Sequence, residues 1–341
     1  MIDFRYHIVS LISVFLALAV GIILGAGPLK DTIGNELTGQ VDQLREEKDA
    51  IRNVLEVKER SNANLNDYIA ASSKRVAKNT LPNRRIAVIQ TGEVSDEVYD
   101  KVEQQLTYAG ATVTARLSLG QAWTAADQAD ARQSYATSLT EYVPEDKKEL
   151  QADKLLASAL MVALSEKSAV SADEMSANAG LALDILDGAD LIDLVKYTPT
   201  PVDAVVMIDA SNVLPDDATD APDFSAASAL QLNVAEAAAR QTEGVVVSTA
   251  TVVETDLVTT IRENASSLKL IATVSDVDEP VGALNTPLAL SAAIGGKFGH
   301  FGFESNATAL VPAAVVLPEP DRTVTGVEPT EQQNSDEDNG N

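Results

Sequence analysis

The chain is 341 residues long and carries 51 acidic against 25 basic side chains, two histidines and no cysteine. Its net charge of −26 repels nucleic acid and anionic lipid headgroups, so no nucleic-acid partner is expected. Without cysteine, disulfides, thiolate metal sites and cysteine nucleophiles are excluded. The length suffices for a membrane segment with one or two domains.

The first predicted element is an apolar helix, because residues 6–29 contain no charged side chain. As a helix this run would be about 36 Å long, enough to cross a bilayer core of about 30 Å. The apolar core of a signal peptide is shorter, about 7–15 residues, and Pro28 follows the small residues at 25–27 that could form a cleavage site. We interpret residues 1–30 as an uncleaved, single-pass membrane anchor. A cleaved signal peptide and a buried core helix are the alternatives.

The charges beside this run do not decide its orientation. Arg5 precedes it, while Lys30, Arg45 and Lys48 follow it, which mildly favours a cytoplasmic body. Large domains are nevertheless translocated largely regardless of their charge. The side of the membrane therefore stays open at this point.

Residues 31–80 are predicted to form a helical stalk. Ten positions between residues 37 and 69 are spaced alternately by four and three residues, and seven of these ten positions hold apolar side chains. This pattern is typical of a coiled coil, with Lys48, Lys58 and Asn62 as polar interruptions that can specify register. The stalk is expected to pair the chain with a second copy; a single amphipathic helix lying on the body is the alternative. The predicted seam consists of Leu37, Val41, Leu44, Ile51, Leu55, Leu65 and Ile69.

Residues 81–317 predict an α/β body. A strand at 86–90, a helix at 95–110 and a strand at 111–119 form a βαβ unit, which implies a Rossmann-like parallel sheet with helices on its faces. Further strands are expected around Val205, at 244–249 and at 268–276. They alternate with helices at 224–242, 254–267 and 286–296.

The segment 121–197 is predicted to be a mostly helical insertion, with helices at 147–165 and 181–196. The body is then either one domain with an insertion or two closely joined lobes. Residues 318–341 are rich in proline and acidic side chains and contain few apolar ones, so this tail is predicted to be disordered.

No catalytic motif is found. The first strand-to-helix turn, 89–97, contains one glycine where a dinucleotide site needs three, and Glu93 occupies the place of a phosphate. The sequence contains neither a phosphate-binding P-loop nor a G-x-S-x-G nucleophile turn. We therefore expect no enzyme, and we predict no catalytic or cofactor-binding residue.

The remaining candidate is a loop at 295–305 that contains four glycines, three phenylalanines and one of the two histidines. One interpretation is structural, with Phe298, Phe301 and Phe303 packed on the sheet. The other is a binding loop in which His300 is the candidate metal ligand. His7 is expected at the membrane interface, and the carboxylates of Asp276 and Asp278 are either ligands or helix caps. The candidate loop residues are Lys297, Phe298, Gly299, His300, Phe301, Gly302 and Glu304.

Several of these segments together resemble the actinobacterial copper-transport family MctB. They are the apolar run at 6–29, the heptads, the first βαβ unit and the Gly299-His300-Phe301-Gly302 loop, and the resemblance extends from residue 1 to about 312. It implies a membrane-anchored envelope protein of copper homeostasis that takes part in copper export or exclusion. It also implies an extracytoplasmic body and, by the family's description, an outer-membrane location. Copper is the implied ligand.

A second class of function stays open beside this one. Soft thiolate and thioether ligands select Cu(I), yet the chain has no cysteine and its methionines at 161, 175 and 207 form no closely spaced pair. The alternative is a non-enzymatic coiled-coil scaffold of the envelope that binds protein or cell-wall partners. The sequence does not identify those partners.

Overall fold

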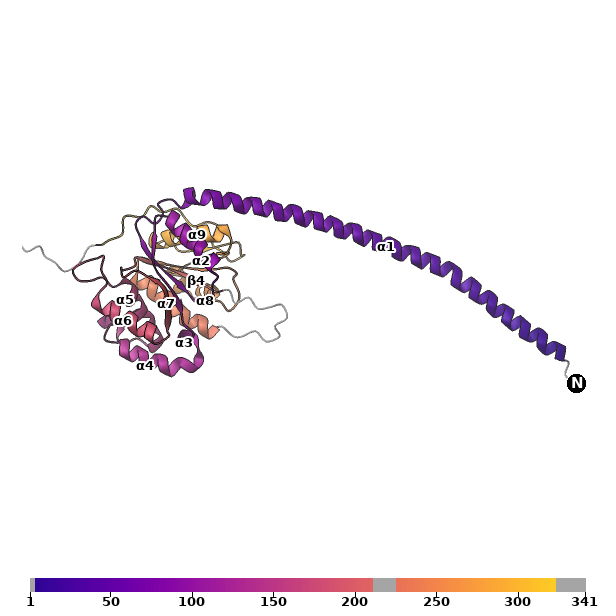
Figure 1. Ribbon diagram of the computed structural model, residues 1–341, viewed down its shortest axis with the longest axis horizontal. Helices are drawn as coiled ribbons and strands as arrows, with labels where there is room; N and C mark the ends of the chain where they lie inside the picture. Colours follow the sequence, from indigo (N-terminus) through magenta and orange to yellow (C-terminus); the bar gives the residue numbers. More distant parts are fainter. Residues whose placement is uncertain (1–3, 211–224, 323–341) are drawn as a thin grey trace, which may run out of the picture. The chain divides into compact units, whose positions relative to one another are not determined.

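The structure, a computed structural model, describes residues 4–210 and 225–322, and for residues 26–35 it describes the backbone only (Figure 1). From residue 323 onward, the predicted disordered tail lies outside the described residues. Residues 318–322 contact the body: the Arg84 guanidinium donates to the Pro318 carbonyl oxygen over 3.1 Å, and Arg322 donates to the Asp203 carboxylate over 3.1 Å.

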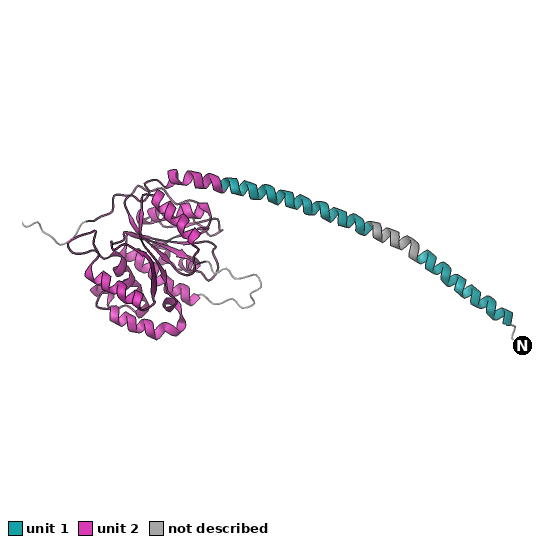
Figure 2. Cartoon of the chain, in the orientation of Figure 1, with its two compact units in different colours: residues 1–65 teal, residues 66–341 magenta. Residues whose placement is uncertain are grey.

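The chain divides into two compact units, residues 1–65 and residues 66–341 (Figure 2). Helix α1, Phe4–Ala77, covers the predicted anchor and most of the predicted stalk without interruption. It ends at Ala77, two residues before Asn79, whose left-handed φ of 59° breaks the helical geometry.

The predicted βαβ unit is confirmed at the start of the body. It consists of β1 (Arg85–Gln90), α2 (Asp96–Tyr108) and β2 (Thr112–Leu119). The Ser95 side chain caps α2 by accepting a hydrogen bond from the Val98 backbone N–H. After the helix, Gly110 adopts a φ of 91°, which a residue with a side chain rarely adopts.

The sheet of the described chain has seven strands in the order β3-β2-β1-β4-β5-β6-β7. All neighbours are parallel except β2 and β3. The remaining strands are β3 (Ile192–Tyr197), β4 (Ala204–Asp209), β5 (Val245–Thr249), β6 (Ala272–Val274) and β7 (His300–Phe301).

The predicted helix at 181–196 is wrong in its second half. Helix α6 (Ala177–Gly188) stops before Asp190, whose left-handed φ of 52° ends the helical geometry, and β3 follows as the antiparallel edge strand. Ile192 and Leu194 alternate with the exposed Asp193 and Val195, a period of two that fits a half-buried strand better than a helix. The two-residue strand β7 was also predicted as loop.

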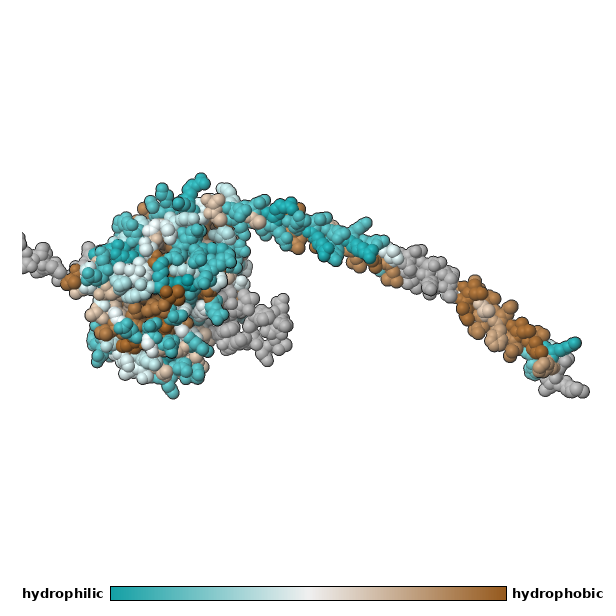
Figure 3. All heavy atoms as spheres, viewed as in Figure 1, coloured by the Kyte–Doolittle hydropathy of each residue, from teal (hydrophilic) through white to brown (hydrophobic). Residues whose placement is uncertain are grey.

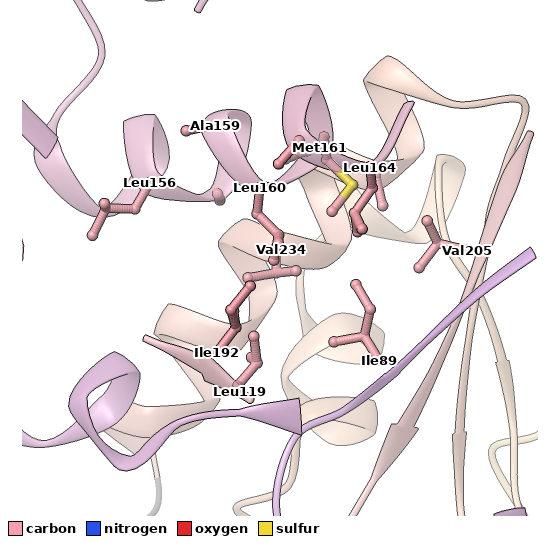
Figure 4. Packing of buried hydrophobic residues seen from close by; sticks show 14 of the residues in the cluster. Ile89, Leu119, Leu156, Ala159, Leu160, Met161, Leu164, Ile192, Val205 and Val234 are labelled. Carbon is pink, nitrogen blue, oxygen red and sulfur yellow. The ribbon is translucent and has the colours of Figure 1, made fainter. Parts of the chain in front are cut away.

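Helices cover both faces of the sheet. The first face carries α5 (Ala152–Ser165), α6, α7 (Ser225–Gln241) and α8 (Leu257–Glu263), together with the shorter α3 (Gln121–Thr124) and α4 (Ala129–Leu139). In Figure 4, Leu160 and Met161 of α5 lie near Val234 of α7, with Ile89 of β1 and Val205 of β4 opposite them. The second face carries α2 and α9 (Pro280–Ile294).

These two layers define a topological switch point between β1 and β4. The helix after β1, α2, packs on the second face, whereas the next helix after β4 in the described chain, α7, packs on the first. Open α/β sheets bind ligands where successive helices diverge in this way, beyond the carboxyl ends of the strands.

Candidate functional site

The amino-terminal helix provides a membrane-spanning candidate. Within the described chain, Phe4–Gly25 is the one helical stretch long and apolar enough to cross a bilayer, and none of it is buried inside the protein. Its apolar surface is brown in Figure 3. Exposed apolar side chains in such a continuous belt require either lipid or another protein to cover them.

The predicted stalk seam divides into two parts. Its first six apolar members are 43–69% exposed and lie along the part of α1 that belongs to the first unit. Ile69 is different, because it packs against the buried cluster between the sheet, α2 and α9. The seam available for a partner in this structure is therefore Leu37, Val41, Leu44, Ile51, Leu55 and Leu65.

His300 is a buried residue of β7 whose ring is engaged. Its Nδ1 lies 2.7 Å from the Thr273 hydroxyl, and that hydroxyl accepts a hydrogen bond from Arg262 Nε over 3.3 Å. Burial, and next the nearby Arg262 guanidinium, lower the pKa of His300 to about 4. The imidazole is therefore neutral at physiological pH.

The loop around His300 packs through one of its three phenylalanines only. Phe301 is 5% exposed, whereas Phe298 is 38% and Phe303 is 64% exposed, so the expectation that all three pack on the sheet is wrong for the latter two. The reason is strand geometry: Phe301 belongs to β7 and pairs with Val274, while the other two lie outside the strand. Lys297, also outside it, is exposed.

The loop does not assemble a metal-ligand cluster. In residues 4–210 and 225–322, no group of three or more His, Asp or Glu side chains is arranged to hold a metal ion. The Glu304 carboxylate instead lies 3.9 Å from the Arg262 guanidinium. A positive charge beside His300 works against a cation at this place, so direct copper coordination by His300 stays a prediction without a preformed set of ligands.

The switch point between β1 and β4 is filled by the protein's own polar groups. Asp209, at the end of β4, accepts a hydrogen bond of 2.5 Å from the Thr91 hydroxyl and one of 3.2 Å from the Leu257 backbone N–H. The Gln231 amide donates to the Thr91 carbonyl oxygen over 3.1 Å. Burial, as the largest cause, raises the pKa of the Asp209 carboxyl to about 6, and Asp256 adds to the rise.

Sequence reasoning missed Asp209 and singled out Asp276 and Asp278 instead. The signal for Asp209 was present, since it ends the most apolar strand of the body, where a carboxylate is costly to bury. Neither of the other two carboxylates caps α9, whose N-cap position is occupied by Glu279. The Asp276 carboxylate accepts from the neighbouring Ser275 hydroxyl over 2.7 Å.

Fold and site together define a protein with an amino-terminal apolar helix and a mixed α/β body. Residues 1–312 match the family described as "Copper transport outer membrane protein, MctB". The chain belongs to this family, which is a transport family and not an enzyme family.

Relatives of the chain have names that refer to the same family. "Copper transporter MctB" of Mycobacterium tuberculosis (strain ATCC 25618 / H37Rv) is 30% identical over 145 residues, which is 40% of this chain and 44% of the relative. The protein of the same name from Mycobacterium leprae (strain TN) is 28% identical over 138 residues, again 40% of this chain and 44% of the relative. These alignments cover less than half of each relative's length.

Proposed function

We propose that this chain is a membrane-anchored, non-enzymatic component of copper homeostasis. The observation that carries the proposal is the family match over residues 1–312, which includes both the apolar helix and the α/β body. Its relatives are named copper transporters, and we therefore propose copper as the cargo. The direction we propose is export or exclusion, which keeps copper out of the cell.

The body supports an indirect role in copper handling better than a role as a copper carrier. Met161 and Met207 are fully buried, and the ring of His300 is engaged with Thr273. Cu(I) prefers thioether and thiolate ligands, and the described surface offers no cluster of them. We therefore propose that the chain acts as an assembled envelope scaffold on which copper tolerance depends.

The direct test compares cells with and without this protein. Cells that lack it should accumulate more copper in copper-containing medium and grow less well there, and the full chain should restore both properties. Two measurements separate export from exclusion. Slower copper loss from preloaded cells that lack the protein would indicate export, and faster copper uptake by copper-depleted cells that lack it would indicate exclusion. Unchanged copper content and unchanged growth would overturn the copper role.

The same cells test the copper site. If His300→Ala is folded, abundant and fully protective, the scaffold proposal stands. If it leaves the cells copper-sensitive, and the purified full chain binds copper with a defined stoichiometry that His300→Ala abolishes, the chain handles copper directly.

A retained anchor is the second part of the proposal. The apolar stretch Phe4–Gly25 is long enough to span the bilayer. Sequencing of the mature amino terminus should find residues upstream of Gly27, in a protein that alkaline carbonate does not extract from membranes. A mature chain that begins near Pro28 would show a cleaved signal peptide instead.

Self-association through the stalk is the third part. Ile51 and Leu55 are exposed neighbours in the seam, and aspartate at both positions would place charges between the helices. The double variant should have a lower molecular mass in solution than the unchanged chain. The control is Asn53→Asp with Val57→Asp, two exposed positions of the same helix that lie on the side opposite the seam. Equal masses for all three proteins would exclude the seam as an interface.

A further inference from the structure

The body contains a cavity that neither the family nor the copper role explains. It has a volume of about 460 Å³, and its lining residues belong to α3, to α4, to the segment between these two helices and to the turn that joins α6 to β3. This volume falls within the range of about 300–1,000 Å³ that is typical of ligand pockets. The polar side chains that line it are Gln121, Asp127, Gln128, Arg132, Tyr135 and Asp190.

The innermost of these groups is a fixed donor. Arg132 is 6% exposed, and its guanidinium is held on two of its three nitrogens. Its Nε donates to Asp153 over 3.0 Å, and its Nη1 donates to the carbonyl oxygens of Ala122 and Ala125 over 3.2 and 2.7 Å.

The third nitrogen is left for a ligand. Arg132 Nη2 donates to no residue of the described chain, and it is not among the enclosed polar atoms that lack a partner, so it keeps an opening to solvent. Because Arg132 lines the cavity, the two N–H groups of Nη2 are available to donate to a molecule that binds there.

The charges around the cavity select against an anion. An anion would meet the carboxylates of Asp127 and Asp190. The single guanidinium in the lining, that of Arg132, already forms an ion pair with Asp153. The site therefore suits a ligand without negative charge that both donates and accepts hydrogen bonds.

Hydroxyl groups meet that requirement, since each of them donates and accepts through a single atom. Donors at the cavity are Arg132 Nη2, the Tyr135 hydroxyl and the two glutamine amides, and acceptors are the two carboxylates and the glutamine oxygens. The half-buried ring of Tyr135 adds a flat apolar face. We infer that this cavity is a binding site for a carbohydrate, through adjacent hydroxyls on a neutral sugar.

One wall of the cavity is formed by two backbone segments in contact, at 120–121 and 190–191, and such contact favours binding because less order has to be created. The Gly120 N–H donates to the Leu191 carbonyl oxygen over 2.9 Å. A side chain at Gly120 would collide with the Asp190 carbonyl oxygen, so the two backbone segments are in direct contact. Trp123 is fully buried directly after the lining residue Ala122 and anchors α3 in the core.

The single tryptophan of the chain, Trp123, supplies the readout. The full chain would be purified in a detergent with a polyoxyethylene headgroup, so that no sugar comes from the detergent. D-glucose, N-acetyl-D-glucosamine and trehalose would each be titrated while tryptophan fluorescence and heat are recorded. We expect saturable binding of at least one sugar with a Kd of about 1 mM. Absence of binding by all three would overturn the inference.

Two lining residues and one control locate the binding. Asp127→Ala and Gln128→Ala should each weaken it by about tenfold, because each removes one hydrogen-bonding group. Gln133→Ala, an exposed position of α4 that does not line the cavity, should leave it unchanged. If all three variants bind the sugar as the unchanged chain does, the sugar binds elsewhere and the cavity is not its site. This inference does not depend on the copper role.

Discussion

Asp209 makes the stability of the body depend on pH, and Asp209→Asn should remove that dependence. The carboxyl is 4% exposed, and burial raises its pKa from the ordinary value of 3.8 to about 6. Between these two values the folded protein binds more protons than the unfolded chain. Stability therefore falls as pH rises through this window, and the difference of about two pKa units corresponds to about 3 kcal/mol.

The asparagine variant retains both hydrogen-bonding partners. Its amide oxygen can accept from the Leu257 N–H, and its amide nitrogen can donate to the Thr91 hydroxyl, which now accepts. Near pH 4 the free energies of unfolding of the two proteins should be similar. At pH 7.5 the variant should be more stable by up to about 3 kcal/mol, because no charge is buried.

The assay is urea unfolding of the full chain between pH 4 and pH 8, followed by the fluorescence of Trp123 in the body. The quantity compared is the difference in unfolding free energy between variant and unchanged chain, so that other titrating groups cancel. Asp130→Asn is the control, since it removes one carboxylate from an exposed helix position. A difference that stays constant across this pH range would refute the burial argument.

Three further predictions use the same unfolding assay. Phe301→Ala should lower the free energy of unfolding by about 3–5 kcal/mol, because it leaves a cavity where a buried ring was. Phe303→Ala, at an exposed position, should change it by less than about 0.5 kcal/mol. Equal effects of the two substitutions would contradict the observed packing. The unchanged chain should lose up to about 3 kcal/mol of stability on acidification from pH 6.5 to 4, because the pKa of His300, lowered to about 4, makes protonation of the ring unfavourable in the folded state. His300→Gln should lose less stability over the same range, because it has no ring to protonate. Parallel pH profiles of the two proteins would contradict the burial of a neutral ring. Gly120→Ala should destabilise the body, because its methyl group would meet the Asp190 carbonyl oxygen. Gly180→Ala, in a helix with open space around that position, should be neutral or slightly stabilising. The opposite order would show that the backbone at Gly120 can move away to admit the methyl group.

Local patterns in the sequence were sufficient for the elements whose character is set by neighbouring residues. The uncharged run at 6–29 predicted the apolar helix, and the strand–helix–strand pattern at 86–119 predicted the first βαβ unit. In both cases hydrophobic periodicity, length and capping residues act over a few turns or one strand, so no distant contact is needed to define them.

Tertiary structure decided what depends on partners far apart in the chain. Residues 192–197 form a strand because β2 offers them a free edge, although a helix pattern precedes them. Ile69 continues the seam pattern, yet it packs on the body because α2 and α9 lie beside it.

The candidate site shows the same division. His300 could be singled out by composition, but the sequence does not reveal that Thr273 and Arg262 engage its ring or that Asp209 fills the switch point with Thr91. The sequence by itself determined which segments are apolar, helical or extended, since those properties follow from periodicity. Only the tertiary structure decided which polar groups are buried and paired, because desolvation and hydrogen bonding depend on contacts between residues distant in sequence.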